Sequence, residues 1–131
     1  MNRNLIPFKD ILEAIHRIEE KFSLERMQFD QDRTVRVWFY HFLQIIGEAC
    51  RSITKEFKEQ HSEVPWRDIN GTRNILVHAY GKVDDNKIWT MLHQDIPSLK
   101  RTITSAFLDE MAQPVWQDEM ACADITNGCV A

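Results

Sequence analysis

The feature that most constrains this chain is a run of apolar side chains at helical spacing between residues 32 and 58. Because each residue turns an ideal helix by about 100°, these side chains fill a single arc of about 140°. The members of this stripe are Val35, Trp38, Phe39, Phe42, Ile45, Ile46, Ala49, Cys50, Ile53 and Phe57. A face this broad predicts one long helix over residues 32–58, at the centre of a helical core, with Cys50 buried in it as a reduced thiol.

Other apolar stripes predict the helices on either side of this one. The spacing of three and four indicates a helix over residues 8–22, whereas residues 23–31 fit either a short helix or a bend. Further along, Pro65 suits the first turn of a helix, and Gly81 suits its C-terminal cap. Residues 70–71, an Asn-Gly pair, allow a kink or turn in the middle of that helix.

Acidic capping residues mark two more helix starts. Asp84 or Asp85 fits the cap of a short helix that continues to Leu92, and Asp95 with Pro97 fits the opening of the last helix. Strand-like alternation of apolar and polar residues is not seen in the sequence. We therefore expect an all-α fold, an antiparallel bundle of four main helices with an additional short helix.

Composition limits what the protein can do. With 131 residues and 44% hydrophobic content, the chain fits one domain, which we place at residues 1–112, followed by a poorly ordered C-terminal tail at residues 113–131. The net charge of -4 argues against a protein that coats nucleic acid or a membrane surface, so any nucleic-acid site must be local. Because neither a signal peptide nor a membrane span is visible, we expect a cytoplasmic protein with no membrane contact.

The side chains with chemical potential gather at residues 73–80. If residues 69–80 form one ideal helix, its core-facing stripe holds Ile69, Thr72, Ile75, Leu76 and Ala79. The other face then gathers Arg73, Asn74, His78 and Tyr80, together with Val77. This map puts Tyr80 within about 20° of Arg73 and predicts that Arg73 and His78 can be removed with little loss of stability. Spacing alone does not distinguish such a face from an ordinary solvated one.

Metal sites are not indicated by the sequence. Glu13 and His16 form one Glu-x-x-His motif, but a di-iron bundle needs two such motifs and further carboxylates. The remaining candidates, His61 and His93, have no partner at ligand spacing. We expect neither a metal nor a cofactor.

The stretch from Arg73 to Tyr80 resembles the Arg, any four, His, any one, Tyr motif of the HEPN superfamily, in its HepT-like toxin branch. The resemblance extends over roughly residues 8–107, where the landmarks follow in order. They are Ile46-Gly47-Glu48-Ala49, Val64-Pro65-Trp66-Arg67, Val83-Asp84, Ile88-Trp89, Ile96-Pro97 and Leu99. One departure is Thr72, where the family commonly has Met.

This resemblance implies a metal-independent ribonuclease toxin of a type VII toxin-antitoxin system, acting as a homodimer with a shared cleft. Its catalytic residues are implied to be Arg73 and His78, with Arg73 and Asn74 contacting RNA phosphate. Imidazole suits general acid or base work near neutral pH, and a guanidinium matches the charge of a reacting phosphate. The toxin is implied to be neutralised when a cognate nucleotidyltransferase antitoxin adds AMP to Tyr80.

Several roles stay open at this point. Asn74 either holds the imidazole, contacts phosphate or makes a plain surface hydrogen bond, and Glu48 either orients Arg73 or anchors helix packing through a salt bridge. Without the motif, Tyr80 reads as a partly buried aromatic that closes the helix. Two other functions compete with the ribonuclease. One is a non-catalytic partner that binds nucleotide or docks onto a small nucleotidyltransferase, and the other is a structural dimerisation domain.

Overall fold

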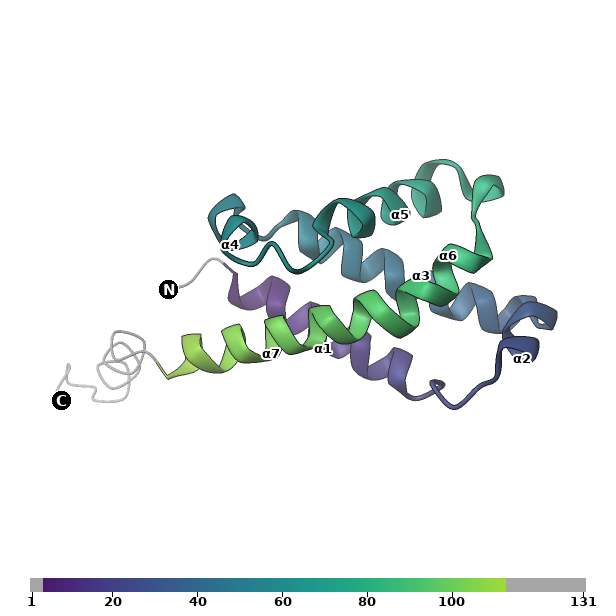
Figure 1. Ribbon diagram of the computed structural model, residues 1–131, viewed down its shortest axis with the longest axis horizontal. Helices are drawn as coiled ribbons and strands as arrows, with labels where there is room; N and C mark the ends of the chain where they lie inside the picture. Colours follow the sequence, from purple (N-terminus) through teal and green to yellow (C-terminus); the bar gives the residue numbers. More distant parts are fainter. Residues whose placement is uncertain (1–3, 113–131) are drawn as a thin grey trace, which may run out of the picture.

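Four long helices carry the core of the computed structural model, which describes residues 4–112 (Figure 1). They are α1 (Leu5–Glu19), α3 (Arg33–Arg51), α5 (Trp66–His78) and α7 (Ile96–Met111). Helix α1 packs between α3 and α7, and α3 packs in turn against α5. Each of these neighbouring pairs runs antiparallel (Figure 1). The predicted all-α architecture with four main helices is therefore confirmed.

The core combines aromatic side chains, such as Phe8 and Phe39, with aliphatic side chains that these helices turn toward one another. The most deeply buried ones on α1, α3 and α7 are Ile11, Ile15, Ile18, Ile46, Leu99 and Ile103. Removing each such side chain from water contributes about 1.5 to 3 kcal/mol to folding. Cys50 lies in this core as a free thiol, as expected, and burial raises its pKa to about 12. The thiol is therefore protonated and acts as an apolar side chain.

The prediction of one helix over residues 32–58 is wrong, because α3 ends at Arg51 and a separate helix, α4 (Lys55–Gln60), follows it. Thr54 caps α4 by accepting a hydrogen bond from the Phe57 amide at 3.4 Å, and its own amide donates to Asn4 Oδ1 at 3.0 Å. Ile53 stays buried across the break. The apolar spacing therefore continues past the end of α3, although Thr54 starts a new helix. Hydrophobic spacing alone does not reveal such a cap.

The other short helices also refine the predicted bundle. Of the two alternatives for residues 23–31, the structure shows a short helix, α2 (Arg26–Gln31). Helix α1 begins and ends about three residues earlier than the predicted range 8–22. Asp32 caps α3 by accepting a hydrogen bond from the Thr34 amide at 2.9 Å. Within residues 4–112, the short α-helices α2, α4 and α6 (Asp85–Thr90) accompany the four long ones, where a single short helix was expected.

Helix α6 runs without a break into α7 through a π-helical turn, η2 (Met91–Asp95). Asp84 caps α6 as expected, accepting a hydrogen bond from the Asn86 amide at 2.9 Å. Helix α7 begins at Ile96 with Asp95 at the N-cap position and Pro97 in its first turn, as expected. Asp95, however, has helical backbone angles and makes no side-chain cap, so α7 continues directly from η2 and does not start after a break. The physical reason is Pro97, whose ring would clash with a carbonyl one α-turn earlier, and a wider π-turn relieves that clash.

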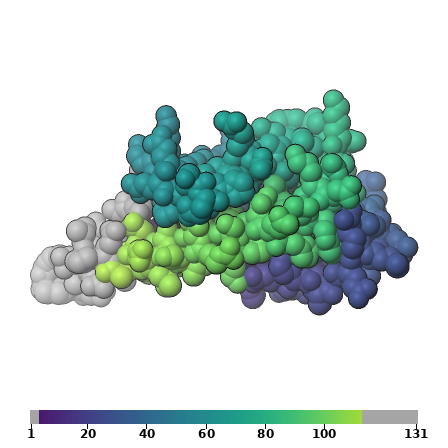
Figure 2. Space-filling model, viewed as in Figure 1, coloured from purple at the N-terminus to yellow at the C-terminus, as the bar shows by residue number. Residues whose placement is uncertain are grey.

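The space-filling view shows how the outer helices cover one face of the molecule (Figure 2). Residues of α4 and α5, in teal, lie alongside those of α7, in green. Across residues 4–112, no helix combines the length and the apolar character needed to cross a bilayer. The predicted tail at residues 113–131, with its two cysteines, lies outside the described residues.

Candidate functional site

The candidate site is built where α3 and α5 approach most closely, at Gly47 and Arg73. Gly47 is buried in the face of α3 that meets α5. A Cβ atom at position 47 would lie 2.4 Å from Arg73 Cβ and 2.7 Å from Arg73 Cγ. Distances under 3 Å are not tolerated between carbon atoms, so the absence of a side chain at Gly47 is what makes room for the stem of Arg73.

Arg73 is held on all three of its guanidinium nitrogens. Its Nε donates a hydrogen bond to Glu48 Oε2 at 2.9 Å, its Nη2 forms an ion pair with the same oxygen at 2.6 Å, and its Nη1 donates to Asn74 Oδ1 at 2.8 Å. Charge-assisted bonds of this kind are the stronger hydrogen bonds in proteins. The structure thus places Glu48 and Asn74 on either side of the same guanidinium, and the amide oxygen of Asn74 contacts Arg73.

Arg73 is much less accessible than the helical map predicts. Only 12% of its side chain is exposed, because α3 covers the face of α5 on which it lies. The single-helix map takes no account of a second helix that carries a glycine at the contact. Because the stem of Arg73 is packed against α3, we now expect its removal to lower stability, in contrast to the expectation from the helical map.

An open hollow of about 600 Å³ lies beside Arg73. Its lining comes from the end of α3 and one side of α5, and consists of Arg51, Asn70, Arg73, Asn74, Ile75, His78 and Ala79. Of the residues singled out from the sequence, Arg73, Asn74 and His78 meet here. His78 is exposed at the last position of α5, so its imidazole is accessible to a bound molecule. The hollow combines a proton-transfer group with cationic donors.

Tyr80 does not lie on the helix, which corrects the predicted map. Helix α5 ends at His78, and Ala79 leaves the helical region with φ of -141° and ψ of 50°. Tyr80 then begins a short 3₁₀ helix, η1 (Tyr80–Lys82), which also contains Gly81. Gly81 is consequently not the cap of α5. The predicted angle of about 20° between Tyr80 and Arg73 does not apply, because it assumed an unbroken helix. No kink occurs at residues 70–71, which lie within α5.

A second tyrosine supports Tyr80. The rings of Tyr40 and Tyr80 meet edge to face, with centroids 5.8 Å apart, and Tyr80 keeps 43% of its surface exposed. The Tyr40 hydroxyl donates to Asp85, which also faces Arg36 at 3.6 Å. Burial, and then the bond to Asp85, raise the pKa of Tyr40 well above its ordinary value. Tyr40 is therefore a fixed, neutral donor, whereas Tyr80 is accessible.

The sequence reasoning missed Gly47, Arg51 and Tyr40 as parts of this region. Gly47 carried a usable signal, because a glycine inside a long helix costs about 1 kcal/mol relative to Ala and calls for a packing reason. Arg51 follows Glu48 by three residues on α3, so the pair they form was also accessible from spacing. Tyr40 gave no such signal, since its contact with Tyr80 depends on how α3 and α5 align.

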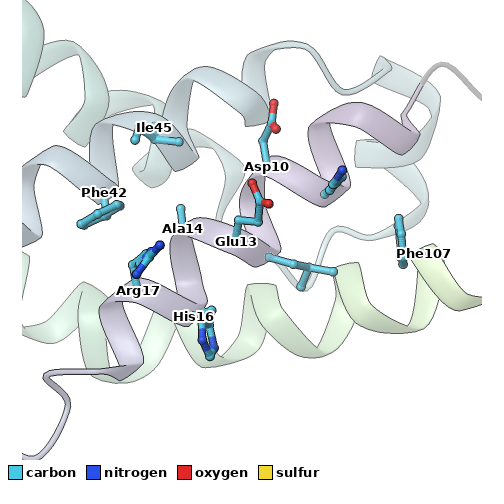
Figure 3. A pocket seen from close by; sticks show the side chains of 10 residues that line it. Asp10, Glu13, Ala14, His16, Arg17, Phe42, Ile45 and Phe107 are labelled. Atoms are coloured by element: carbon cyan, nitrogen blue, oxygen red, sulfur yellow. The ribbon is translucent and has the colours of Figure 1, made fainter.

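Another hollow, of about 650 Å³, lies between α1, α3 and α7 (Figure 3). It contains Glu13 and His16, the Glu-x-x-His pair, and Figure 3 shows these two side chains pointing away from each other. Among residues 4–112, no three His, Cys, Asp or Glu side chains form a group that could hold a metal ion. This hollow mixes apolar, acidic and basic side chains and has none of the motif residues.

Comparison with known proteins identifies similar chains. A family model described as Ribonuclease HepT-like matches residues 11–106. The "Probable ribonuclease HepT" of Thermococcus cleftensis is 43% identical over 94 residues, covering 70% of this chain and 84% of that relative. The "Putative RNase MJ1380" of Methanocaldococcus jannaschii is 35% identical over 95 residues, covering 72% of this chain and 87% of that relative. No solved structure matches the chain.

The close contact of the two helices yields a stability prediction. Gly47→Ala places a methyl group against Arg73, so either α5 or the arginine must move. We expect the free energy of unfolding to fall by about 1 to 3 kcal/mol, as for other overpacking substitutions. Urea unfolding followed by circular dichroism measures this change.

Gly71→Ala is the matched control, because an added Cβ there meets nothing within 4 Å. As an Ala in the interior of α5, it should raise stability by up to about 1 kcal/mol. Equal effects of the two substitutions would show that the Gly47 contact does not constrain the helix pair.

Proposed function

Because this chain belongs to the HepT-like ribonuclease family, we propose that it is a metal-independent endoribonuclease that acts as the toxin of a type VII toxin-antitoxin pair in the cytoplasm. The observation that carries this proposal is the meeting of Arg73, Asn74 and His78 in one open hollow. An accessible imidazole beside a positioned guanidinium is what cleavage of a phosphodiester requires.

The reaction uses the nucleophile that RNA itself carries. A base takes the proton of the 2'-hydroxyl, the 2'-oxygen forms a bond to phosphorus, and the bond from phosphorus to the 5'-oxygen breaks as that oxygen receives a proton. His78 exchanges these protons, and Arg73 stabilises the charge that builds on the phosphate oxygens. Glu48 and Asn74 hold the guanidinium in place through the three contacts described above. The products are a 2',3'-cyclic phosphate and a 5'-hydroxyl.

A homodimer completes this mechanism. One imidazole does not readily serve as base and acid in the same step, whereas two copies of α5 facing each other give one cleft two histidines. Pairing across a two-fold axis is the commonest form of protein oligomer. The C-terminal end of α5 offers a surface for this contact, because Val77 is 38% exposed there and His78 is also exposed.

His78→Ala should abolish cleavage of a single-stranded RNA substrate, while cleavage by the wild type should survive EDTA and leave cyclic phosphate ends. The reason is that each of the two proton transfers uses a His78 imidazole, one from each copy of the chain, and no step needs a metal. His16→Ala, which removes another exposed histidine on α1, is the matched control and should cut like the wild type. Cleavage is followed on denaturing gels, and the ends are identified by mass spectrometry.

Inducible expression without a partner extends the same test to the cell. Growth arrest by the wild type and not by His78→Ala is the result expected of a toxin. If purified wild type leaves RNA intact and its expression is as harmless as that of His78→Ala, the chain is instead a nucleotide-binding or docking partner of a small nucleotidyltransferase. Loss of cleavage in EDTA would contradict the metal-independent reaction.

The dimer is tested by its mass in solution. Light scattering at micromolar concentration should give about twice the 15.5 kDa mass of one chain. Val77→Glu, which puts charge on the proposed contact, should shift the protein toward monomer and lower its cleavage rate. A wild type that is monomeric yet fully active would contradict the shared cleft.

Tyr80 is the proposed site of neutralisation by a cognate nucleotidyltransferase. Its phenol oxygen forms a bond to the α-phosphorus of ATP, and pyrophosphate leaves as the phenol proton is lost. The added AMP carries negative charge close to the end of α5, where it competes with RNA phosphate for cationic side chains. Intact-mass measurement after incubation with the cognate nucleotidyltransferase, ATP and magnesium should show the mass gain of one AMP group. Tyr80→Phe should prevent this mass gain and keep RNA cleavage.

The chain has two tyrosines, which supplies an internal control. Tyr40→Phe removes the other phenol, which is 8% exposed, and should leave the mass gain intact. An equal gain on Tyr80→Phe, or none on the wild type, would contradict the assignment of Tyr80.

A further inference from the structure

The hollow holds a second guanidinium, that of Arg51, for which neither the motif nor the mechanism has a use. Arg51 is the last residue of α3, and it lines the hollow together with Arg73 and His78. Its side chain is 52% exposed. The contact that holds it is an ion pair with Glu48, in which Nη1 lies 3.7 Å from Oε1. That separation is longer than a hydrogen bond.

Glu48 therefore divides its two oxygens between two arginines. Oε2 takes both contacts from Arg73, a hydrogen bond from Nε at 2.9 Å and an ion pair with Nη2 at 2.6 Å, whereas Oε1 faces Arg51 without a hydrogen bond. The Arg73 charge is largely offset by this carboxylate, and each of its three nitrogens already has a contact within the protein. Arg51 keeps an accessible guanidinium whose donors are not taken up by Glu48.

The two cations consequently differ in how easily a phosphate can reach them. An ion pair with half-exposed partners is worth about 0 to 1 kcal/mol, so Arg51 can leave Glu48 at little cost and turn toward an incoming anion. Arg73 is 12% exposed and its charge is offset by Glu48, so it attracts an approaching phosphate less strongly than Arg51 does. The first phosphate of an entering strand thus meets Arg51 before Arg73.

We propose that Arg51 is an RNA-binding residue, which captures a backbone phosphate in the hollow and brings the strand to Arg73 and His78. The ligand class is a single-stranded polyribonucleotide, recognised through its phosphodiester charge and not through its bases. When Arg51 turns to the phosphate, Glu48 keeps both of its contacts with Arg73, so capture of the strand leaves the catalytic guanidinium in place. This proposal rests on the proposed function.

Arg51→Gln tests it through steady-state cleavage of a short RNA. We expect KM to rise about tenfold, which corresponds to about 1.4 kcal/mol, with kcat within about twofold of the wild type. The slope of log KM against log salt should fall by about 0.7, the value for one phosphate contact on a single strand. Arg51→Lys keeps the charge and should restore the salt slope, while circular dichroism confirms that both variants fold.

Arg17→Gln is the matched control. Arg17 lies on α1, is 60% exposed and forms an ion pair at 3.5 Å with Glu20, the C-cap residue three positions further along. Its loss changes the net charge equally and should leave KM and the salt slope unchanged. Equal shifts in the two variants would mean that net charge alone is responsible, and would overturn the role of Arg51.

The outcomes separate this proposal from the function on which it rests. If the wild type cuts RNA and Arg51→Gln cuts with the same KM and salt slope, the role of Arg51 is wrong and the ribonuclease stands. If the wild type does not cut, RNA binding measured by fluorescence anisotropy with the same RNA tests the role of Arg51. Weaker binding by Arg51→Gln than by Arg17→Gln supports the capture site, whereas equal binding, or none by the wild type, overturns it.

Discussion

The close packing of α3 on α5 at Gly47 is the constraint on which the rest of the site depends. Because position 47 has no Cβ, the stem of Arg73 fits against the α3 backbone, and its guanidinium reaches the carboxylate of the next residue, Glu48. The same alignment has a second consequence two turns away. Tyr40 precedes Gly47 by seven residues, Tyr80 follows Arg73 by seven, and their rings meet as well. One helix pairing thus positions both groups.

The packing of α3 on α5 also determines how the charges of Arg73 and Glu48 are paired. A guanidinium that is 12% exposed needs a partner, and Glu48 supplies one from the neighbouring helix. That pairing fixes the orientation of Arg73 but also offsets its charge, so positioning and attraction of a phosphate make opposing demands on one residue. In our proposal, two arginines divide these demands. Arg73 is held close to His78 in the lining of the hollow, and Arg51 remains half-exposed at the end of α3.

Periodicity predicted the architecture well, since burial of an apolar stripe is what determines where a helix lies. It failed where a local polar interaction competes with that stripe, as at Thr54, which ends the long apolar run by capping a new helix. The motif identified Arg73, Asn74 and His78 as neighbours, and the structure brings them together in the hollow. It did not reveal that Arg73 is covered, because exposure depends on the facing helix and on Gly47. Arg51 and Tyr40 lie outside the motif, and their proximity to residues of α5 and η1 depends on how α3 packs against α5.

His78 and Tyr80, on either side of the end of α5, are held in position by different contacts. His78 is the last residue of a helix that is anchored by buried Ile69 and Leu76, so its backbone is set by the packing of the bundle. Tyr80 follows a residue with non-helical angles, and its position depends on η1 and on the ring of Tyr40, which Asp85 in turn fixes from the start of α6. A group attached to Tyr80 would therefore affect the connection between α5 and α6 and not the contact between Gly47 and Arg73. The packing that positions Arg73 thus does not depend on the connection that holds Tyr80.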